Sequence, residues 1–164
     1  MTSLHVPPRC LILACGNTLR GDDGVGPWLA AWAEDRFCRQ LEVQVISRQQ
    51  WTPELAEDIA RVRAVLFLDC SLLSPAGAVT VAAVDSATPG GAARTHHQGA
   101  PELLALAQEL FGAGPQTALM LTVGAGSTSL GEVFSEPVMA ALPEACRQLE
   151  ALVLQCTAAD TPGQ

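Results

Sequence analysis

The stretch Cys10-Leu-Ile-Leu-Ala-Cys15 is a continuous apolar run, and it is followed at once by a glycine-rich segment from Gly16 to Gly26. A short apolar run that ends at a Gly-Asn pair is typical of a strand buried on both faces. Pro27 fits the first turn of a helix, which we expect to continue over residues 28–37. This part of the chain therefore predicts a strand, a loop and a helix, the repeating unit of an α/β fold.

The same alternation continues along the chain. Further strands are expected at residues 41–46, 64–68, 78–84 and 118–123, and further helices at 53–61, 101–111 and about 136–155. The second helix is expected to begin with Thr52 as its N-cap and Pro53 in its first turn. The order of these strands and helices along the chain predicts a three-layer α/β/α sandwich with a mostly parallel, twisted sheet of about five strands. Residues 1–164 are expected to form one domain, with an ordered core over roughly 9–156 and a frayed tail at 157–164.

Composition excludes several classes of function. The chain has 164 residues, 49% of them hydrophobic and 16% charged, which favours a folded globule over a disordered chain. The formal net charge of −8 disfavours a nucleic-acid binder and attachment to an anionic membrane. Neither a signal peptide nor an apolar run near the ~20 residues of a membrane span is visible, so we expect a cytoplasmic protein without membrane insertion.

The six cysteines show no C-x-x-C spacing, which argues against a zinc ribbon or a thioredoxin-type site. Cys10, Cys15 and Cys70 lie in or beside apolar runs, where a thiol behaves as a small hydrophobic side chain. We therefore expect reduced cysteines in the core.

Three polar features are expected to meet beyond the carboxyl ends of the strands, where open α/β sheets bind their ligands. They are the pair Asp22-Asp23 after the first strand, Asp69 after the third strand, and the pair His96-His97 in a loop spanning residues 85–100. Two sources of carboxylate plus an imidazole would suit a divalent transition metal. The first loop, Gly16 to Gly26, is not a typical phosphate-binding loop. It lacks the G-x-G-x-x-G and G-K-[ST] patterns of such loops, and the carboxylates of Asp22 and Asp23 would repel a phosphate.

Each feature also has a structural interpretation. One of the two loop aspartates could cap a helix, Asp69 could serve only as a hydrogen-bonding partner, and the adjacent histidines could be incidental. The sequence alone leaves these alternatives open.

The segment Gly16-Asn-Thr-Leu-Arg-Gly-Asp-Asp-Gly-Val-Gly26 resembles the signature of the [NiFe]-hydrogenase maturation endopeptidases, G-N-x-L-x-x-D-[DE]-x-x-G after an apolar strand. The resemblance extends over nearly the whole chain in element order and length, through the aspartate after the third strand to the histidine loop before Pro101. It departs at Ala14, where the family usually has glycine, and at residues 48–51, where many members have a G-G-T-like turn. The segment beginning Arg48-Gln-Gln-Trp51 resembles a subgroup that processes soluble, cofactor-reducing hydrogenases.

The resemblance implies an activity, a metal and a partner. Asp23, Asp69 and His96 are implied as metal-binding and catalytic residues, with His97 as the alternative to His96. The implied reaction removes the C-terminal extension of a [NiFe]-hydrogenase large-subunit precursor after nickel insertion. The nickel would be carried by that precursor, and Cd or Zn could occupy the site in vitro. Three other functions are weighed: a non-catalytic nickel chaperone or scaffold, a nucleotide-binding protein of Rossmann or flavodoxin type, and a peptidase that acts on another precursor.

Overall fold

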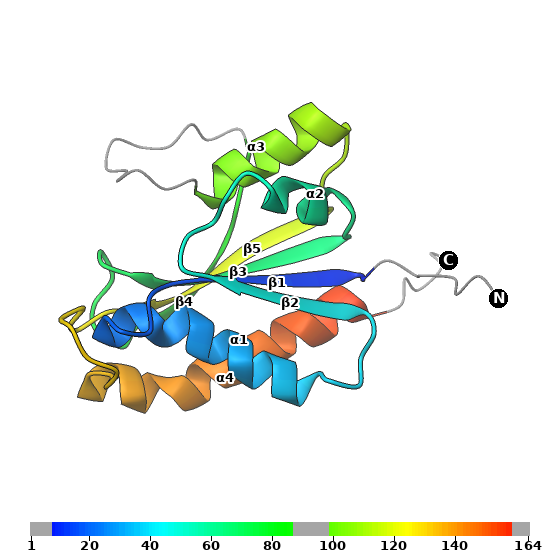
Figure 1. Cartoon of the computed structure of the whole chain (residues 1–164). Helices are drawn as coiled ribbons and strands as arrows, with labels where there is room; N and C mark the ends of the chain where they lie inside the picture. Colours follow the sequence, from blue (N-terminus) through cyan, green and yellow to red (C-terminus); the bar gives the residue numbers. More distant parts are fainter. Residues whose placement is uncertain (1–7, 87–98, 159–164) are drawn as a thin grey trace.

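The computed structural model describes residues 8–86 and 99–158 of the chain. In these two ranges five strands form one sheet in the order β2-β1-β3-β5-β4 (Figure 1). Among the described strands only β4 runs antiparallel to its neighbour, so the predicted fold class is confirmed. The bounds are β1 Cys10–Cys15, β2 Val43–Arg48, β3 Ala64–Ser71, β4 Val79–Ala83 and β5 Thr117–Gly124.

Helices cover both faces of this sheet. Helices α1 (Val25–Arg36) and α4 (Glu136–Thr157) lie side by side on one face, and α2 (Leu55–Ala60) and α3 (Ala100–Phe111) lie on the other (Figure 1). None of the helices in the described part of the chain is both long and apolar enough to cross a membrane.

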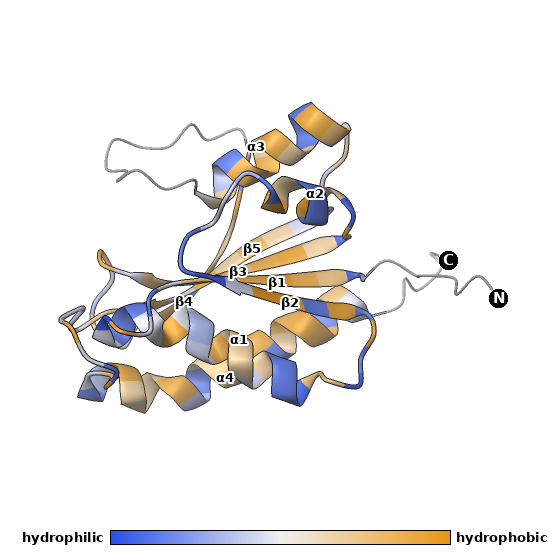
Figure 2. Cartoon of the chain, in the orientation of Figure 1, coloured by the Kyte–Doolittle hydropathy of each residue, from blue (hydrophilic) through white to orange (hydrophobic). Residues whose placement is uncertain are grey.

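The core consists of two layers because successive side chains of a strand point to opposite faces. Ile12 of β1 and Leu68 of β3 pack under α1 and α4, whereas Leu13 and Phe67 pack under α2 and α3. Strands β1 and β3 are consequently hydrophobic along most of their length (Figure 2). This explains why both strands appear in the sequence as continuous apolar runs.

The strand order contains one reversal that matters for function. From β1 the chain crosses through α1 to β2 on one side, and it then returns through α2 to β3 on the other side of β1. The carboxyl ends of β1 and β3 therefore form a topological switch point, the usual ligand-binding position in such sheets.

Several predicted boundaries were wrong by a few residues. Strand β2 begins and ends two residues later than expected, because its register follows β1 from the pair Cys10–Val43 to the pair Cys15–Arg48. Helix α2 begins at Leu55 with Glu54, and not Thr52, in the N-cap position; the backbone N–H of Leu55 donates to the Thr52 carbonyl. Strand β3 continues to Ser71, so Asp69 lies inside the strand and not after it.

Candidate metal centre

The loop between β1 and α1 is folded tightly against the strand ends by glycine. Gly16 has a φ of 149°, and a Cβ on it would lie 2.0 Å from the Asp23 carbonyl oxygen. A Cβ on Gly26 would lie 2.4 Å from the Cys15 carbonyl oxygen and 3.0 Å from that of Leu68. Helix α1 can therefore begin in direct contact with β1 and β3 because residue 26 has no side chain.

Asp22 lies in a short 3-10 turn, Gly21–Gly24, that leads directly into α1. Its side chain is fully buried, and its carboxylate accepts hydrogen bonds from the backbone N–H groups of Gly126, Ser127 and Ser135 and from the Ser135 hydroxyl. Burial opposes ionisation, but these donors outweigh it and lower the pKa of Asp22. Asp22 therefore joins the first loop to the segment that precedes α4, which is a structural role.

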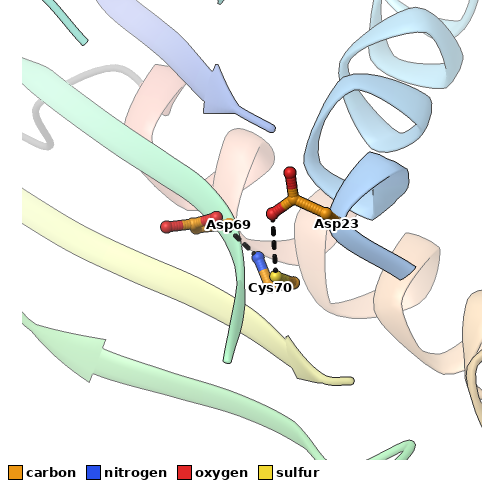
Figure 3. Close-up of side chains that lie close together, drawn as sticks. All are labelled: Asp23, Asp69 and Cys70. Atoms are coloured by element: carbon orange, nitrogen blue, oxygen red, sulfur yellow. Dashed lines mark hydrogen bonds between the residues drawn. The ribbon is translucent and has the colours of Figure 1, made fainter. Parts of the chain in front are cut away.

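Asp23 is the next residue, and its half-buried carboxylate faces the end of β3 (Figure 3). One oxygen, Oδ2, accepts the backbone N–H of Asn17 at 2.8 Å. The other, Oδ1, accepts the thiol of Cys70 at 3.4 Å. The pair Asp22-Asp23 thus separates into one buried structural carboxylate and one carboxylate at the strand ends.

Asp69 lies in the central strand, opposite Thr122 of β5, and is half-buried. Its Oδ1 accepts the backbone N–H of Cys70 at 2.8 Å. Burial raises the pKa of Asp69 to about 7; the Cys70 N–H partly opposes this rise, and the negative charge of Asp23 adds to it. A carboxyl group in this position keeps its proton to a higher pH than an exposed aspartate does, and a bound cation would oppose this shift.

The structure brings Asp23 and Asp69 together, as the strand order predicts. A carboxylate oxygen of each and the Sγ of Cys70 all lie within 4.8 Å of one another (Figure 3). Carboxylates and a thiolate are ligands that proteins offer to divalent transition metals. The three side chains can therefore approach a single ion.

A cleft of about 800 Å³ opens beside these residues. Its walls come from the β1–α1 loop, the segment after β2, strands β3, β4 and β5, and the start of α3. They include Asn17, Asp23, Gln49, Gln50, Trp51, Asp69, Leu72, Asp85, Gly99, Pro101 and Met120. Such a cleft can hold an extended peptide segment next to the carboxylates.

His96 and His97 lie outside the described residues, so the structure gives no position for either imidazole. The nearest described residues on either side in the cleft lining are Asp85 and Gly99. The histidine ligand therefore stays a prediction.

Two cysteines near the carboxylates were not among the predicted site residues. Cys70 does pack against the core under α1 and α4, as a small hydrophobic side chain would, but its Sγ also contacts Asp23. Cys15 lines the cleft, and burial, followed by the charges of Asp69 and Asp23, raises the pKa of its thiol to about 12. The only sequence signal for Cys70 was its position directly after Asp69.

Similarity to known proteins is found among solved structures. No protein-family model matches the chain, and no curated protein matches it. Among solved structures, the hydrogenase maturating endopeptidase HybD from E. coli is similar with a TM-score of 0.67 and 18% identity, over 91% of this chain and 94% of that one. At this identity the likeness establishes the fold.

Two further structures are more similar in sequence. The [NiFe] hydrogenase maturation protease HycI from Thermococcus kodakarensis has a TM-score of 0.65 and 26% identity, over 90% of this chain and 91% of that one. The hydrogenase 2 maturation peptidase from a Thaumarchaeota archaeon has a TM-score of 0.64 and 26% identity, over 89% of this chain and 99% of that one. The resemblance to hydrogenase maturation endopeptidases that the glycine-rich loop indicates is thereby confirmed.

Proposed function

We propose that this chain is an endopeptidase that removes the C-terminal extension of a [NiFe]-hydrogenase large-subunit precursor after nickel has been inserted. The observation that carries the proposal is the meeting of Asp23 and Asp69 at the switch point of the sheet, beside an open cleft. The similar solved structures, which are hydrogenase maturation proteases, support the same reaction class.

Recognition in this proposal depends on the metal of the substrate. Nickel seated in the precursor is part of the substrate, and its vacant positions would be filled by Asp23 and Asp69. His96 is proposed as the third ligand, with His97 as the alternative; Asp85 and Gly99, on either side of the histidine-bearing segment, line the same cleft. Precursor without nickel would have nothing for the carboxylates to hold, so docking would report that insertion is complete.

The residues of this chain would orient the peptide and control its surroundings. Docking onto Asp69 displaces the proton that its raised pKa retains, and the new cation balances the charges of both aspartates. A metal-bound water could then attack the peptide bond next to the docking point, the chemistry by which a divalent cation generates a nucleophile near neutral pH. No serine or cysteine nucleophile is needed in this scheme.

The proposal is tested by incubating the purified chain with nickel-loaded and nickel-free precursor and measuring the mass of the large subunit. We expect shortening of the nickel-loaded precursor alone, and loss of that shortening in Asp23→Asn. Asp35→Asn, which alters an exposed carboxylate on α1, is the matched control and should process normally. Equal shortening of both precursors would contradict recognition of nickel, and no shortening of either would favour a non-catalytic nickel scaffold.

A further inference from the structure

Cys70 contacts both carboxylates of the candidate centre. Its backbone N–H donates to Asp69 Oδ1 at 2.8 Å, and its thiol donates to Asp23 Oδ1 at 3.4 Å (Figure 3). Asp69 and Cys70 are consecutive in β3, whereas Asp23 comes from the loop that enters α1. The residue thus lies where the strand meets the loop, with its sulfur turned toward the oxygen of Asp23.

We propose that Cys70 Sγ is a further protein ligand of the metal that Asp23 and Asp69 bind. The proposal rests on the proposed function, because it assigns a donor atom to the same centre. An ion held at about 2.1 Å by a carboxylate oxygen and about 2.3 Å by a thiolate separates these two atoms by roughly 3.1 to 3.6 Å at bond angles between 90° and tetrahedral. The observed separation of 3.4 Å between Asp23 Oδ1 and Cys70 Sγ lies within that interval.

The two carboxylates and the thiolate together favour some metal ions over others. Two carboxylates alone favour hard cations such as Mg²⁺, Ca²⁺ or Mn²⁺, and a thiolate shifts the preference toward Zn²⁺, Cd²⁺ or Ni²⁺. Binding forms a metal–sulfur bond, breaks the thiol S–H bond and releases that proton to solvent. The thiol–carboxylate hydrogen bond is replaced by two bonds to one ion, so the atoms need not move far.

The first test is a titration of the purified full chain with Cd²⁺, followed by ultraviolet absorption. A sulfur ligand gives a sulfur-to-metal charge-transfer band, which carboxylates do not. We expect a band that saturates at one ion per chain and disappears in Cys70→Ser and in Asp23→Asn, with the Cd²⁺ affinity of Cys70→Ser lower by about tenfold or more. Cys38→Ser removes an exposed thiol elsewhere and is expected to keep the band.

A second measurement needs no substitution. X-ray absorption of the zinc-loaded wild-type chain should show one sulfur at about 2.3 Å together with oxygen ligands. This measurement tests the sulfur ligand even if Cys70→Ser does not fold. Circular dichroism would show whether that variant is folded.

The outcomes separate this inference from the proposed function. Tight, Asp23-dependent binding without a sulfur signature would overturn the ligand role of Cys70 and leave it as a residue that orients Asp23. Failure of the wild-type chain to bind Cd²⁺ or Zn²⁺ would overturn it as well. In either case, selective cleavage of nickel-loaded precursor by the wild-type chain would leave the proposed function standing.

Discussion

The carboxylate of Asp22 accepts two hydrogen bonds from Ser135, one from its backbone N–H at 2.7 Å and one from its hydroxyl at 2.6 Å. These residues are 113 positions apart in the sequence. Their hydrogen bonds connect the segment before the N-terminus of α1 to the segment before the N-terminus of α4. Asp23, the next residue, faces Asp69 and Cys70 at the candidate metal centre instead. Two adjacent and chemically identical side chains thus have different roles because one is buried among donors and the other is not.

Replacing Asp22 should destabilise the fold. In Asp22→Ala the backbone N–H groups of Gly126, Ser127 and Ser135 lose their shared acceptor in a buried position. We expect the free energy of unfolding to fall by roughly 3 kcal/mol, measured by urea denaturation. Asp23→Asn is the matched control; its amide oxygen can still accept the Asn17 N–H, so its unfolding should change little. Equal losses of unfolding free energy in the two variants would contradict a structural role that Asp22 has and Asp23 lacks.

Replacing the carboxylates of the centre should abolish activity and preserve the fold. Asp23→Ala and Asp69→Ala each remove a ligand from the proposed docking site, so neither should shorten nickel-loaded precursor. Circular dichroism and the melting temperature should show that both variants are folded. A variant that still processes the precursor at the wild-type rate would remove that residue from the site.

Stability without metal should depend on pH through Asp69. The pKa of Asp69 is about 7 in the folded chain, against an ordinary aspartate value of 3.8, so the folded state binds this proton more tightly than the unfolded state. Its contribution is therefore fully present below pH 3.8 and is lost as pH rises toward about 7. Unfolding free energies measured across this range should decline with pH in the wild type and decline less in Asp69→Asn. Identical slopes would show that Asp69 does not carry a raised pKa.

Gly26 should tolerate no side chain. Its added Cβ would lie 2.4 Å from the Cys15 carbonyl oxygen, which is backbone and cannot easily move. We expect Gly26→Ala to lose about 1–3 kcal/mol of unfolding free energy, since overpacking outweighs the helix propensity of alanine. Gly114→Ala meets only the Gln108 side chain, at 3.8 Å, and should stay within about 0.5 kcal/mol of wild type. A neutral Gly26→Ala would refute the close contact between α1 and the strand ends.

Much of the fold could be predicted because the strands that carry the site are buried on both faces. The sequence predicts strand β1 with its observed bounds, and the apolar run at 64–68 forms most of β3, the central strand. The end of β3 could not be predicted from hydropathy, since Asp69, Cys70 and Ser71 are held in the strand by pairing with residues 122–124 of β5. Partner strands, and not local composition, decide such ends.

The site was predictable only in part, for the same physical reason. The strand order predicts that Asp23 and Asp69 meet, because parallel strands place their carboxyl ends at one edge. Which of Asp22 and Asp23 faces that edge depends on burial and on donors contributed by residues 126–135, far away in sequence. For Cys70 the sequence offers only its position directly after Asp69, and a thiol beside apolar residues usually serves packing alone.

The central claim is that Asp23 and Asp69 share one ion, and anomalous diffraction from crystals soaked in a nickel or cadmium salt measures it directly. The account predicts a single strong peak at bonding distance, about 2.0–2.4 Å, from a carboxylate oxygen of each aspartate. Crystals in which this position stays empty, or in which the ion binds one aspartate and ignores the other, would contradict it.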